Sequence, residues 1–417
     1  MMPKRSKSPM AAQKSASIKE GPLSGIRILD LTAIVLGPMA TQMLGDYGAD
    51  VIKIEPFEGD RIRGTGVSIG PGMSALFLAL NRNKRSIALN LKSPEGVVVL
   101  QKLIPTVDVI IHNMRVSAIE RLGFGYGSVS KMNPNIVYCA ATGFDQDGPC
   151  GDRPALDDII QAASGLVSLN SLRGNEPEYT PSLIADKTAG MAVVNAVLAA
   201  LVHRGRTGKG QYVEVPMFET MVTFMMTEHL AGMTYKSFPA KAGYDRLLEG
   251  GRKPTRTVDG YMAILPYTGE HWDELFKMAG RPELIEKYQV HNTRSRSANV
   301  VELYAELRRI VLLKTTSEWM KVCERLDIPA TPIYALDDLP QHPQLQAVKL
   351  FCTAKHPSQG TIAYLRPPTK FSATPASIRA LAPELGEHTE IILREAGFES
   401  AEIDDLESCR AVFIRRN

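Results

Sequence analysis

The residue of this 417-residue chain that is best placed to do chemistry is Asp186. It stands at the start of a long apolar segment, residues 183–204, which is rich in small side chains and predicts a helix. A carboxylate at a helix N-terminus meets backbone N–H groups and the positive end of the helix dipole. We therefore expect Asp186 to stay ionised and fixed, as a carboxylate nucleophile must be. The alternative, which this segment alone favours, is that Asp186 is only the N-cap of the helix.

A second pair of acids, Asp157 and Asp158, precedes another predicted helix with small residues. Taken alone, the pair is best explained as a helix cap, and the alternative is a second acid near Asp186. A serine hydrolase has no support, because the sequence contains no G-x-S-x-G motif. A metal site is not expected, because the five cysteines and eight histidines are dispersed and form no C-x-x-C, H-x-x-x-H or H-E-x-x-H pair.

Basic residues gather in predicted loops and at the ends of predicted elements in the first part of the chain. Such a collection suits a phosphorylated ligand, since arginine binds phosphate in a bidentate fashion. The alternative is an ordinary solvated rim of charges. Nucleic acid is not an expected partner, because most of the chain is near neutral and no basic motif is interleaved with aromatic residues. The basic residues are Arg61, Arg63, Arg82, Lys84, Arg85, Arg115 and Arg121.

The elements that must position these residues alternate between strand and helix from Gly25 onward, which predicts an α/β fold with a parallel, doubly wound sheet. The second predicted strand ends on an acid, Glu55, as in dinucleotide-binding folds. However, the preceding turn has no G-x-G-x-x-G motif, and Pro38 removes a backbone donor, so we reject NAD binding. The strand patterns cover residues 25–32, 49–55, 85–91, 107–114 and 135–144.

Length and composition indicate two domains and a tail. Residues 1–22 are basic and poor in large apolar side chains, so we expect a disordered tail, with no secretory signal. We assign residues 23–235 to a large domain, 236–345 to a smaller α/β domain, and 346–417 to a segment that returns to the large domain. No apolar run is expected to cross a membrane. The odd number of dispersed cysteines indicates reduced thiols and a cytoplasmic protein.

Eight blocks of the sequence, taken in order, resemble the family III CoA transferases, the CaiB/BaiF group that also contains formyl-CoA transferase and the alpha-methylacyl-CoA racemases. The resemblance covers roughly residues 22–412, nearly the whole chain. The blocks are DLTAIVLGPMATQMLGDYGADVIKIE, GDRIRG, NRNKRSIALNLKSPEG, HNMRVSAIERLGFGYGSV, NPNIVYCAATGFDQDGP, IADKTAGM, GKGQYVEVPMFE and PELGEHT.

The resemblance implies a Rossmann-like large domain built from both chain ends, a small domain between them, and two subunits interlocked as a homodimer. It implies a transfer of coenzyme A between an acyl-CoA and a small carboxylic acid, with CoA as a substrate and no permanently bound cofactor. The family nucleophile maps to Asp186, within the segment from Pro181 to Gly190, and the second acid maps to Asp157. The residues that would bind CoA map to Arg63, Asn81, Asn83, Lys84, Arg85, Asn113 and Arg121.

Three departures from the family pattern limit what can be carried over. The racemases place a histidine before the second acid, but this chain has Leu156, which disfavours a racemase because proton exchange needs two acid/base groups. Only Gly250 and Gly251 stand near the glycine-rich loop of formyl-CoA transferase, which puts a lid there in doubt, and Val35 replaces that enzyme's glutamine. A racemase or isomerase and a non-catalytic acyl-CoA-binding subunit remain the alternatives.

Overall fold

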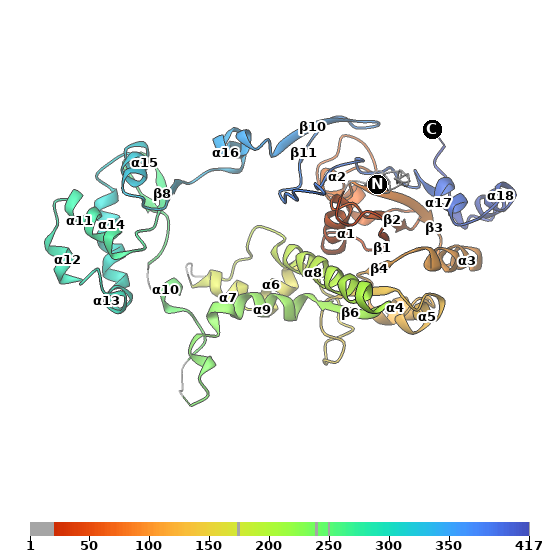
Figure 1. Ribbon diagram of the computed structural model, residues 1–417, viewed down its shortest axis with the longest axis horizontal. Coiled ribbons are helices and arrows are strands. Elements are labelled where there is room, and N and C mark those ends of the chain that lie inside the picture. Colours follow the sequence, from red (N-terminus) through yellow and green to blue (C-terminus); the bar gives the residue numbers. More distant parts are fainter. Residues whose placement is uncertain (1–20, 173–175, 238–240, 249–250, 417) are drawn as a thin grey trace, which may run out of the picture. The chain divides into compact units, whose positions relative to one another are not determined.

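The computed structural model describes residues 21–172, 176–237, 241–248 and 251–416 (Figure 1). Nearly all of the predicted basic tail, and Gly250 of the Gly250–Gly251 pair, lie outside these residues. The chain divides into two compact units. The large unit comprises the described parts of Met1–Val167, Glu178–Val222 and Lys349–Asn417, and the small unit comprises those of Ser168–Pro177 and Thr223–Val348.

The large unit is built on a seven-stranded sheet in the order β12-β3-β2-β1-β4-β5-β6. All neighbouring pairs are parallel except β12 and β3, which are antiparallel. The mixed α/β fold with a large, mainly parallel sheet is therefore confirmed. The strands are β1 (Arg27–Leu31), β2 (Asp50–Glu55), β3 (Lys84–Leu89), β4 (Val109–His112), β5 (Val137–Thr142), β6 (Gln211–Pro216) and β12 (Val412–Phe413).

Helices connect these strands, and the buried apolar faces of strands and helices form the core of the large unit. Four of the five inner strands, β1, β2, β4 and β5, are almost entirely buried, as expected for parallel strands that are covered on both faces. A separate hairpin of β10 (Phe351–His356) and β11 (Gly360–Leu365) lies in the C-terminal part. The helices of the large unit are α1 (Leu36–Asp46), η1 (Arg61–Gly64), α2 (Ala75–Leu80), α3 (Pro94–Leu103), η2 (Ile104–Thr106), α4 (Val116–Arg121), α5 (Tyr126–Met132), α6 (Asp157–Ala163), α8 (Ile184–Thr207), α17 (Thr389–Glu395) and α18 (Ser400–Ser408).

The small unit has its own three-stranded sheet, in which β8 (Tyr261–Ile264) pairs antiparallel with β7 (Thr255–Arg256) and β9 (Ala330–Pro332). Its core packs around Trp272 and Trp319.

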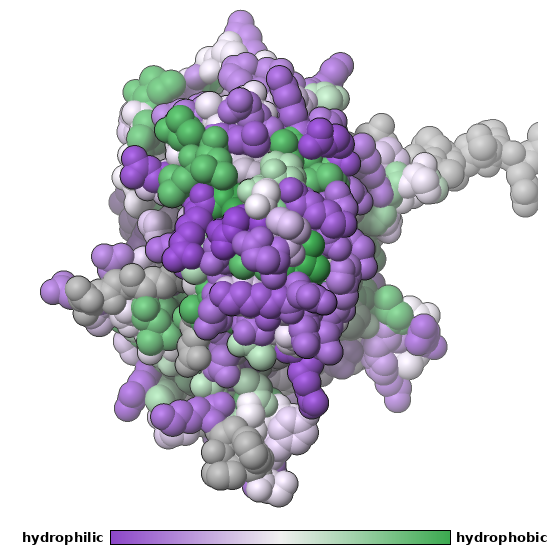
Figure 2. Space-filling model, turned by 90° about the vertical axis from the view of Figure 1, so that its left-hand side faces the viewer, coloured by the Kyte–Doolittle hydropathy of each residue, from purple (hydrophilic) through white to green (hydrophobic). Residues whose placement is uncertain are grey.

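Figure 2 shows one face of the protein surface, on which hydrophilic side chains predominate and apolar residues form small patches. The helices of the small unit are η3 (Ala231–Thr234), α10 (Asp245–Leu248), α11 (Gly269–Met278), α12 (Glu283–Lys287), α13 (Thr293–Ala298), α14 (Val300–Val311), α15 (Thr316–Arg325), η4 (Leu336–Gln341) and α16 (Pro343–Ala347), while α7 (Leu166–Ser171) and α9 (Met217–His229) cross the division between the units.

Helix α8 corrects one expectation from the sequence. Its 24 residues are long and apolar enough to cross a membrane by length and composition, although the sequence was expected to contain no such run. The helix packs against α1, β5 and β6 of the large unit. Core helices of soluble proteins meet the same criterion, so this feature alone is weak evidence for a membrane protein.

Candidate active site

Asp186 is the third residue of α8, and only 9% of it is exposed. The N-cap is Leu183, whose side chain makes no capping hydrogen bond, so the interpretation of Asp186 as the N-cap is wrong. Within the part of the chain that the structure describes, the Asp186 carboxylate accepts no hydrogen bond. The structure therefore presents a nearly buried carboxylate whose oxygens are uncommitted.

The neighbouring acid, Asp157, performs the capping that the sequence assigned to Asp186. Asp157 begins α6 and is 4% exposed, and its Oδ2 accepts a hydrogen bond of 2.9 Å from the backbone N–H of Asp186. The Gln161 Nε2 donates to Asp157 Oδ1 at 2.5 Å and to the Ser182 carbonyl at 3.1 Å. The Gln161 Oε1 accepts from the Thr180 N–H at 2.9 Å. Gln161 thus ties α6 to the segment before α8, and it was not among the residues predicted from the sequence.

The electrostatics of Asp186 also differ from the expectation. Burial, followed by the negative charges of Asp157 and Asp158, raises the pKa of Asp186 to about 7. We expected an acid held firmly ionised by the helix N-terminus. The reason for the correction is geometric: the N–H group that would stabilise the ionised form belongs to Asp186 itself and is donated to Asp157.

A close contact between α8 and α1 sets the position of Asp186. A Cβ atom at Gly190 would lie 2.8 Å from the Leu36 carbonyl oxygen, so only glycine permits this approach. Asp186 precedes Gly190 by one helical turn on the same face, a rise of about 6 Å. Close packing against Leu36 therefore explains why glycine stands at position 190. Asp186 therefore lies on the face of α8 that packs against α1.

A cavity of about 880 Å³ opens at the carboxyl ends of β1, β2, β3 and β4. Its walls come from the loops that follow these four neighbouring strands, which is where open α/β sheets bind ligands. The lining includes the residues Leu31–Ile34 after β1, Pro56–Arg61 after β2, Leu89–Lys92 around the end of β3, and Asn113 and Met114 after β4. The β1–α1 loop therefore has this cavity on one side and leads on the other to the α1–α8 contact.

One of the predicted CoA-binding residues, Asn113, lines this cavity, and a second, Arg121, is the chain neighbour of a lining residue. Asn113 lines it and pairs with Ala33, donating to its carbonyl at 2.8 Å and accepting from its N–H at 2.9 Å. Arg121 is exposed and adjoins Leu122, which also lines the cavity. Arg61 and Lys92 are exposed lining residues as well. None of these three cations forms an ion pair with another described residue.

The sequence places Arg61 among the basic residues that suit a phosphorylated ligand but not among the residues mapped from the family, and Lys92 was not predicted. The available signal for Lys92 was its place directly after the predicted strand 85–91, because side chains there reach the carboxyl edge of the sheet. The three free cations, Arg61, Lys92 and Arg121, suit a ligand that carries several phosphates.

Two other predicted CoA-binding residues, Arg63 and Lys84, are buried and paired. Arg63, 4% exposed, donates to both Glu55 oxygens at 2.7 and 2.8 Å and stacks over the Phe77 ring. Lys84, 1% exposed, lies 3.0 Å from Asp30, and burial lowers its pKa to about 8. In this chain their cationic groups face buried acids, which corrects the expectation of direct phosphate contacts.

The three remaining predicted CoA-binding residues also make contacts within the protein: Asn81, Asn83 and Arg85. Asn81 holds the Lys84 ammonium at 2.9 Å, and Asn83, at a φ of 58°, donates to Asp46 at 2.8 Å. Arg85 is the second residue of β3 and pairs with Asp50 at the start of β2. Because the two strands are parallel, Arg85 lies at the amino edge of the sheet, away from the cavity at the carboxyl edge. The structure therefore does not bring Arg85 together with Asn113.

Comparison with known proteins identifies the family of this chain. The sequence profile described as CoA-transferase family III matches residues 23–389. The mouse succinyl-CoA:glutarate CoA-transferase is 33% identical over 378 residues, which are 90% of this chain and 86% of that protein. The formyl-CoA:oxalate CoA-transferase of Shigella boydii is 31% identical over 415 residues, 94% of this chain and 99% of that protein.

Solved structures show the same relationship. A crystal structure of a CaiB/BaiF family protein from Brucella suis has a TM-score of 0.76 and 29% identity, and covers 90% of this chain and 100% of that chain. The predicted family is thereby confirmed. This chain belongs to CoA-transferase family III and is a CoA transferase, an enzyme that moves CoA between an acyl-CoA and a carboxylic acid.

Proposed function

We propose that this enzyme transfers CoA through two covalent intermediates on Asp186. The Asp186 carboxylate attacks the thioester carbonyl of the donor acyl-CoA and releases CoA thiolate, which leaves an acyl-aspartyl anhydride. The thiolate then attacks the aspartyl carbonyl of the anhydride, which releases the donor acid as a carboxylate and forms an aspartyl-CoA thioester. The acceptor carboxylate runs these two steps in reverse, so that a new acyl-CoA leaves and the Asp186 carboxylate is regenerated.

The uncommitted oxygens of Asp186 are the observation that carries this proposal. A carboxylate that already accepts several hydrogen bonds is a weaker nucleophile, whereas the Asp186 carboxylate accepts none from the described residues. Burial and the charge of Asp157 raise its pKa to about 7, so the ionised form is more basic than an exposed aspartate. The same burial keeps water away from an anhydride, which hydrolysis would otherwise destroy.

The cavity at the carboxyl edge of the sheet is the proposed site of CoA. The exposed cations Arg61, Lys92 and Arg121 would pair with its phosphates, since unpaired cations beside a cavity attract polyanions. The β1–α1 loop forms one wall of this cavity and ends at the contact between Leu36 and Gly190, one helical turn from Asp186. A CoA molecule whose nucleotide lies in the cavity would therefore extend its thiol over this loop toward Asp186.

Asp157 has a positioning role in this proposal. It fixes the start of α8 by accepting the Asp186 N–H, and its charge raises the pKa of the nucleophile. It does not attack substrate, because both of its oxygens already accept hydrogen bonds, one from Asp186 and one from Gln161. The assignment also fits the absence of a second acid/base group at Leu156 that a racemase would need.

Trapping the intermediate on Asp186 tests the mechanism. The enzyme is quenched during turnover with hydroxylamine, which converts an aspartyl thioester or anhydride to a hydroxamate, and the peptide that contains residue 186 is analysed by mass spectrometry. Substrate pairs to screen are succinyl-CoA with glutarate and formyl-CoA with oxalate, as in the named relatives.

We expect the modification at Asp186, and a loss of turnover of about 10³-fold or more for Asp186→Asn. The matched control is Asp158→Asn, which removes a neighbouring exposed carboxylate and should remain active. Turnover that survives Asp186→Asn, or a label found only at another residue, would contradict the proposal.

A further inference from the structure

Side chains from four parts of the fold hold the β1–α1 loop, residues Thr32–Val35. The first three backbone N–H groups of this loop donate to side-chain oxygens instead of to other backbone groups. Two loop carbonyls accept from side chains, Thr32 from the Lys53 ammonium at 2.9 Å and Ala33 from the Asn113 amide at 2.8 Å. The three N–H bonds are Thr32 to Asp30 at 2.9 Å, Ala33 to Asn113 at 2.9 Å and Ile34 to Asp60 at 3.1 Å.

Ile34 is strained within this loop. Its φ is +73°, in the left-handed region, and it is the β-branched member of the described non-glycine residues with positive φ. A β-branched side chain there crowds its own backbone, so the conformation persists only where the surroundings impose it. Ile34 lines the cavity and is half-buried against the cluster around Ile62 and Phe77.

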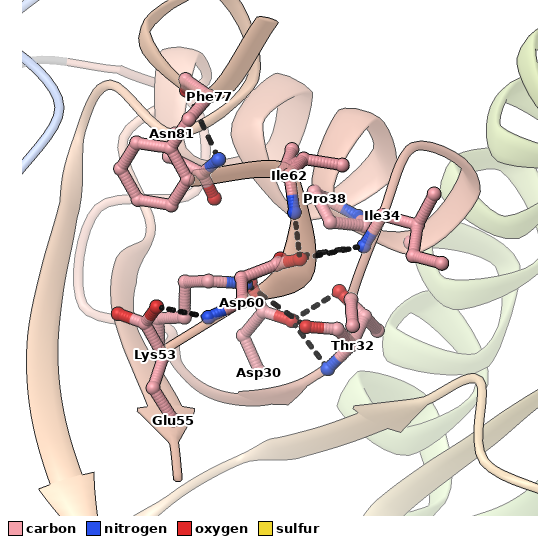
Figure 3. A network of polar contacts seen from close by, with 12 residues as sticks. Asp30, Thr32, Ile34, Pro38, Lys53, Glu55, Asp60, Ile62, Phe77 and Asn81 are labelled. Atoms are coloured by element: carbon pink, nitrogen blue, oxygen red, sulfur yellow. Dashed lines mark hydrogen bonds and ion pairs between the residues drawn. The ribbon is translucent and has the colours of Figure 1, made fainter. Parts of the chain in front are cut away.

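The Asp60 carboxylate supplies this constraint (Figure 3). It accepts the Ile34 N–H at 3.1 and 3.3 Å and the Ile62 N–H at 3.2 Å. It is also paired with the Lys53 ammonium at 3.0 Å, and the side chains of both residues are at most 1% exposed. The backbone N–H of Asp60 donates to Glu55 at 3.0 Å. Asp60 is therefore anchored from β2 while it holds the loop after β1.

The charges around Lys53 favour its pairing with Asp60. Burial alone would lower the pKa of Lys53, but Asp30, Asp60 and Glu55 together raise it above its ordinary value. Lys53 therefore stays charged, and it connects the carboxylate of Asp60 to the carbonyl of Thr32 at the start of the loop.

We propose that Asp60 is a positioning residue for acyl-CoA binding: it holds Ile34 in the left-handed conformation and thereby fixes the loop that walls the cavity. Without this carboxylate, Ile34 relaxes toward negative φ and moves the wall. The inference rests on the proposed function in one respect, namely that this cavity binds CoA.

A double-mutant cycle between Asp60→Ala and Ile34→Gly tests the inference, with the affinity for CoA measured by calorimetry on the full chain. Asp60→Ala alone should weaken CoA binding about tenfold, the cost of a left-handed non-glycine residue. In the presence of Ile34→Gly the same change should weaken binding less than about threefold, because glycine adopts this φ without steric cost. An equal loss in both backgrounds overturns the inference.

Two controls distinguish a loss of loop positioning from a nonspecific loss of structure. Asp46→Ala also removes a buried carboxylate, which pairs with Arg82 at 2.6 Å at the far end of α1. Its effect on CoA binding should be the same with and without Ile34→Gly. CoA binding by the unchanged protein is the reference. If the unchanged protein did not bind CoA, that result would contradict the proposed function and would leave the coupling between Asp60 and Ile34 unaddressed.

A second measurement leaves Asp60 intact, in case Asp60→Ala does not fold. Glycine normally destabilises a protein relative to alanine, but the order reverses at positive φ. Ile34→Gly should therefore unfold at a higher denaturant concentration than Ile34→Ala. At the neighbouring Ala33, whose φ is not positive, Ala33→Gly should lower the midpoint. A higher midpoint for Ile34→Ala than for Ile34→Gly overturns the inference.

Discussion

At the scale of single residues, the state of Asp186 governs how the enzyme responds to pH. The nucleophile must be ionised, and its pKa is raised to about 7 by burial, then by Asp157 and Asp158. Below a pH of about 7 the Asp186 carboxyl is mostly protonated and cannot act as a nucleophile, so kcat/KM should fall as the pH drops through that value. Asp157→Asn removes the larger of the two repulsions, so ionised Asp186 persists further into acid and the midpoint moves to lower pH.

The test is a pH profile of kcat/KM for the unchanged enzyme, Asp157→Asn and Asp158→Asn. Asp158→Asn should shift the midpoint in the same direction but less, in line with its smaller effect on the pKa. A midpoint that stays in place or rises in Asp157→Asn would show that Asp157 does not act through its charge.

The exposed cations around the cavity give a second prediction at this scale. Lys92→Ala and Arg121→Ala should each raise the KM for acyl-CoA about fivefold to tenfold and leave kcat nearly unchanged, because each removes one charge-assisted contact to phosphate. Arg206→Ala is the matched control, since Arg206 is an exposed cation at the other end of α8. Steady-state kinetics at two salt concentrations provide the measurement, and equal effects at all three positions would refute the assignment.

At the scale of elements, the packing of α8 on α1 sets the position of Asp186. Alanine normally stabilises a helix relative to glycine by up to about 1 kcal/mol. At Gly190, however, the added Cβ would lie 2.8 Å from the Leu36 carbonyl. We expect Gly190→Ala to lower the free energy of unfolding by about 1–3 kcal/mol and to reduce kcat, because the helix that carries the nucleophile must move.

Gly205 provides the control in the same helix. An added Cβ there would meet nothing within 4 Å, so Gly205→Ala should be neutral or stabilising. Urea unfolding of both variants measures the change in the free energy of unfolding that each substitution causes. Similar effects of the two substitutions would mean that the α1–α8 contact does not constrain α8.

At the scale of the whole molecule, the exposure of apolar residues near the site bears on assembly. Leu156 and Ile159 of the α6 region are 61% and 51% exposed, and Met191 of α8 is 46% exposed. Covering these side chains with a partner chain would remove their apolar surface from water. The intertwined homodimer stays a prediction on this basis.

Light scattering in solution tests it. We expect a mass of twice the 45.7 kDa of one chain, and a lower mass or a loss of soluble protein for Met191→Glu. Val202→Glu, which changes an exposed apolar residue near the other end of α8, is the comparison. A mass of one chain for the unchanged protein would contradict the prediction.

Some features follow from local sequence. Apolar runs separated by helical patterns already indicate a parallel sheet, because burial on both faces demands continuous apolar strands. Likewise, Asp186 at the head of an apolar helix and Asn113 after a strand are placed by their neighbours in the chain. Such local rules do not reveal partners distant in sequence, which is why Gln161 and its bonds to Asp157 and Ser182 were missed.

The sequence by itself determined the fold class, the family and the candidate nucleophile, since each depends on patterns within short segments or on their order. Only the tertiary structure decided which charges are free. Arg63 and Lys84 look like ligands in the sequence but neutralise the buried acids Glu55 and Asp30, while Lys92 faces the cavity unpaired. The physical reason is that a charged side chain binds a ligand strongly only if no opposite charge of the protein lies nearer. Folding decides which charges lie near one another.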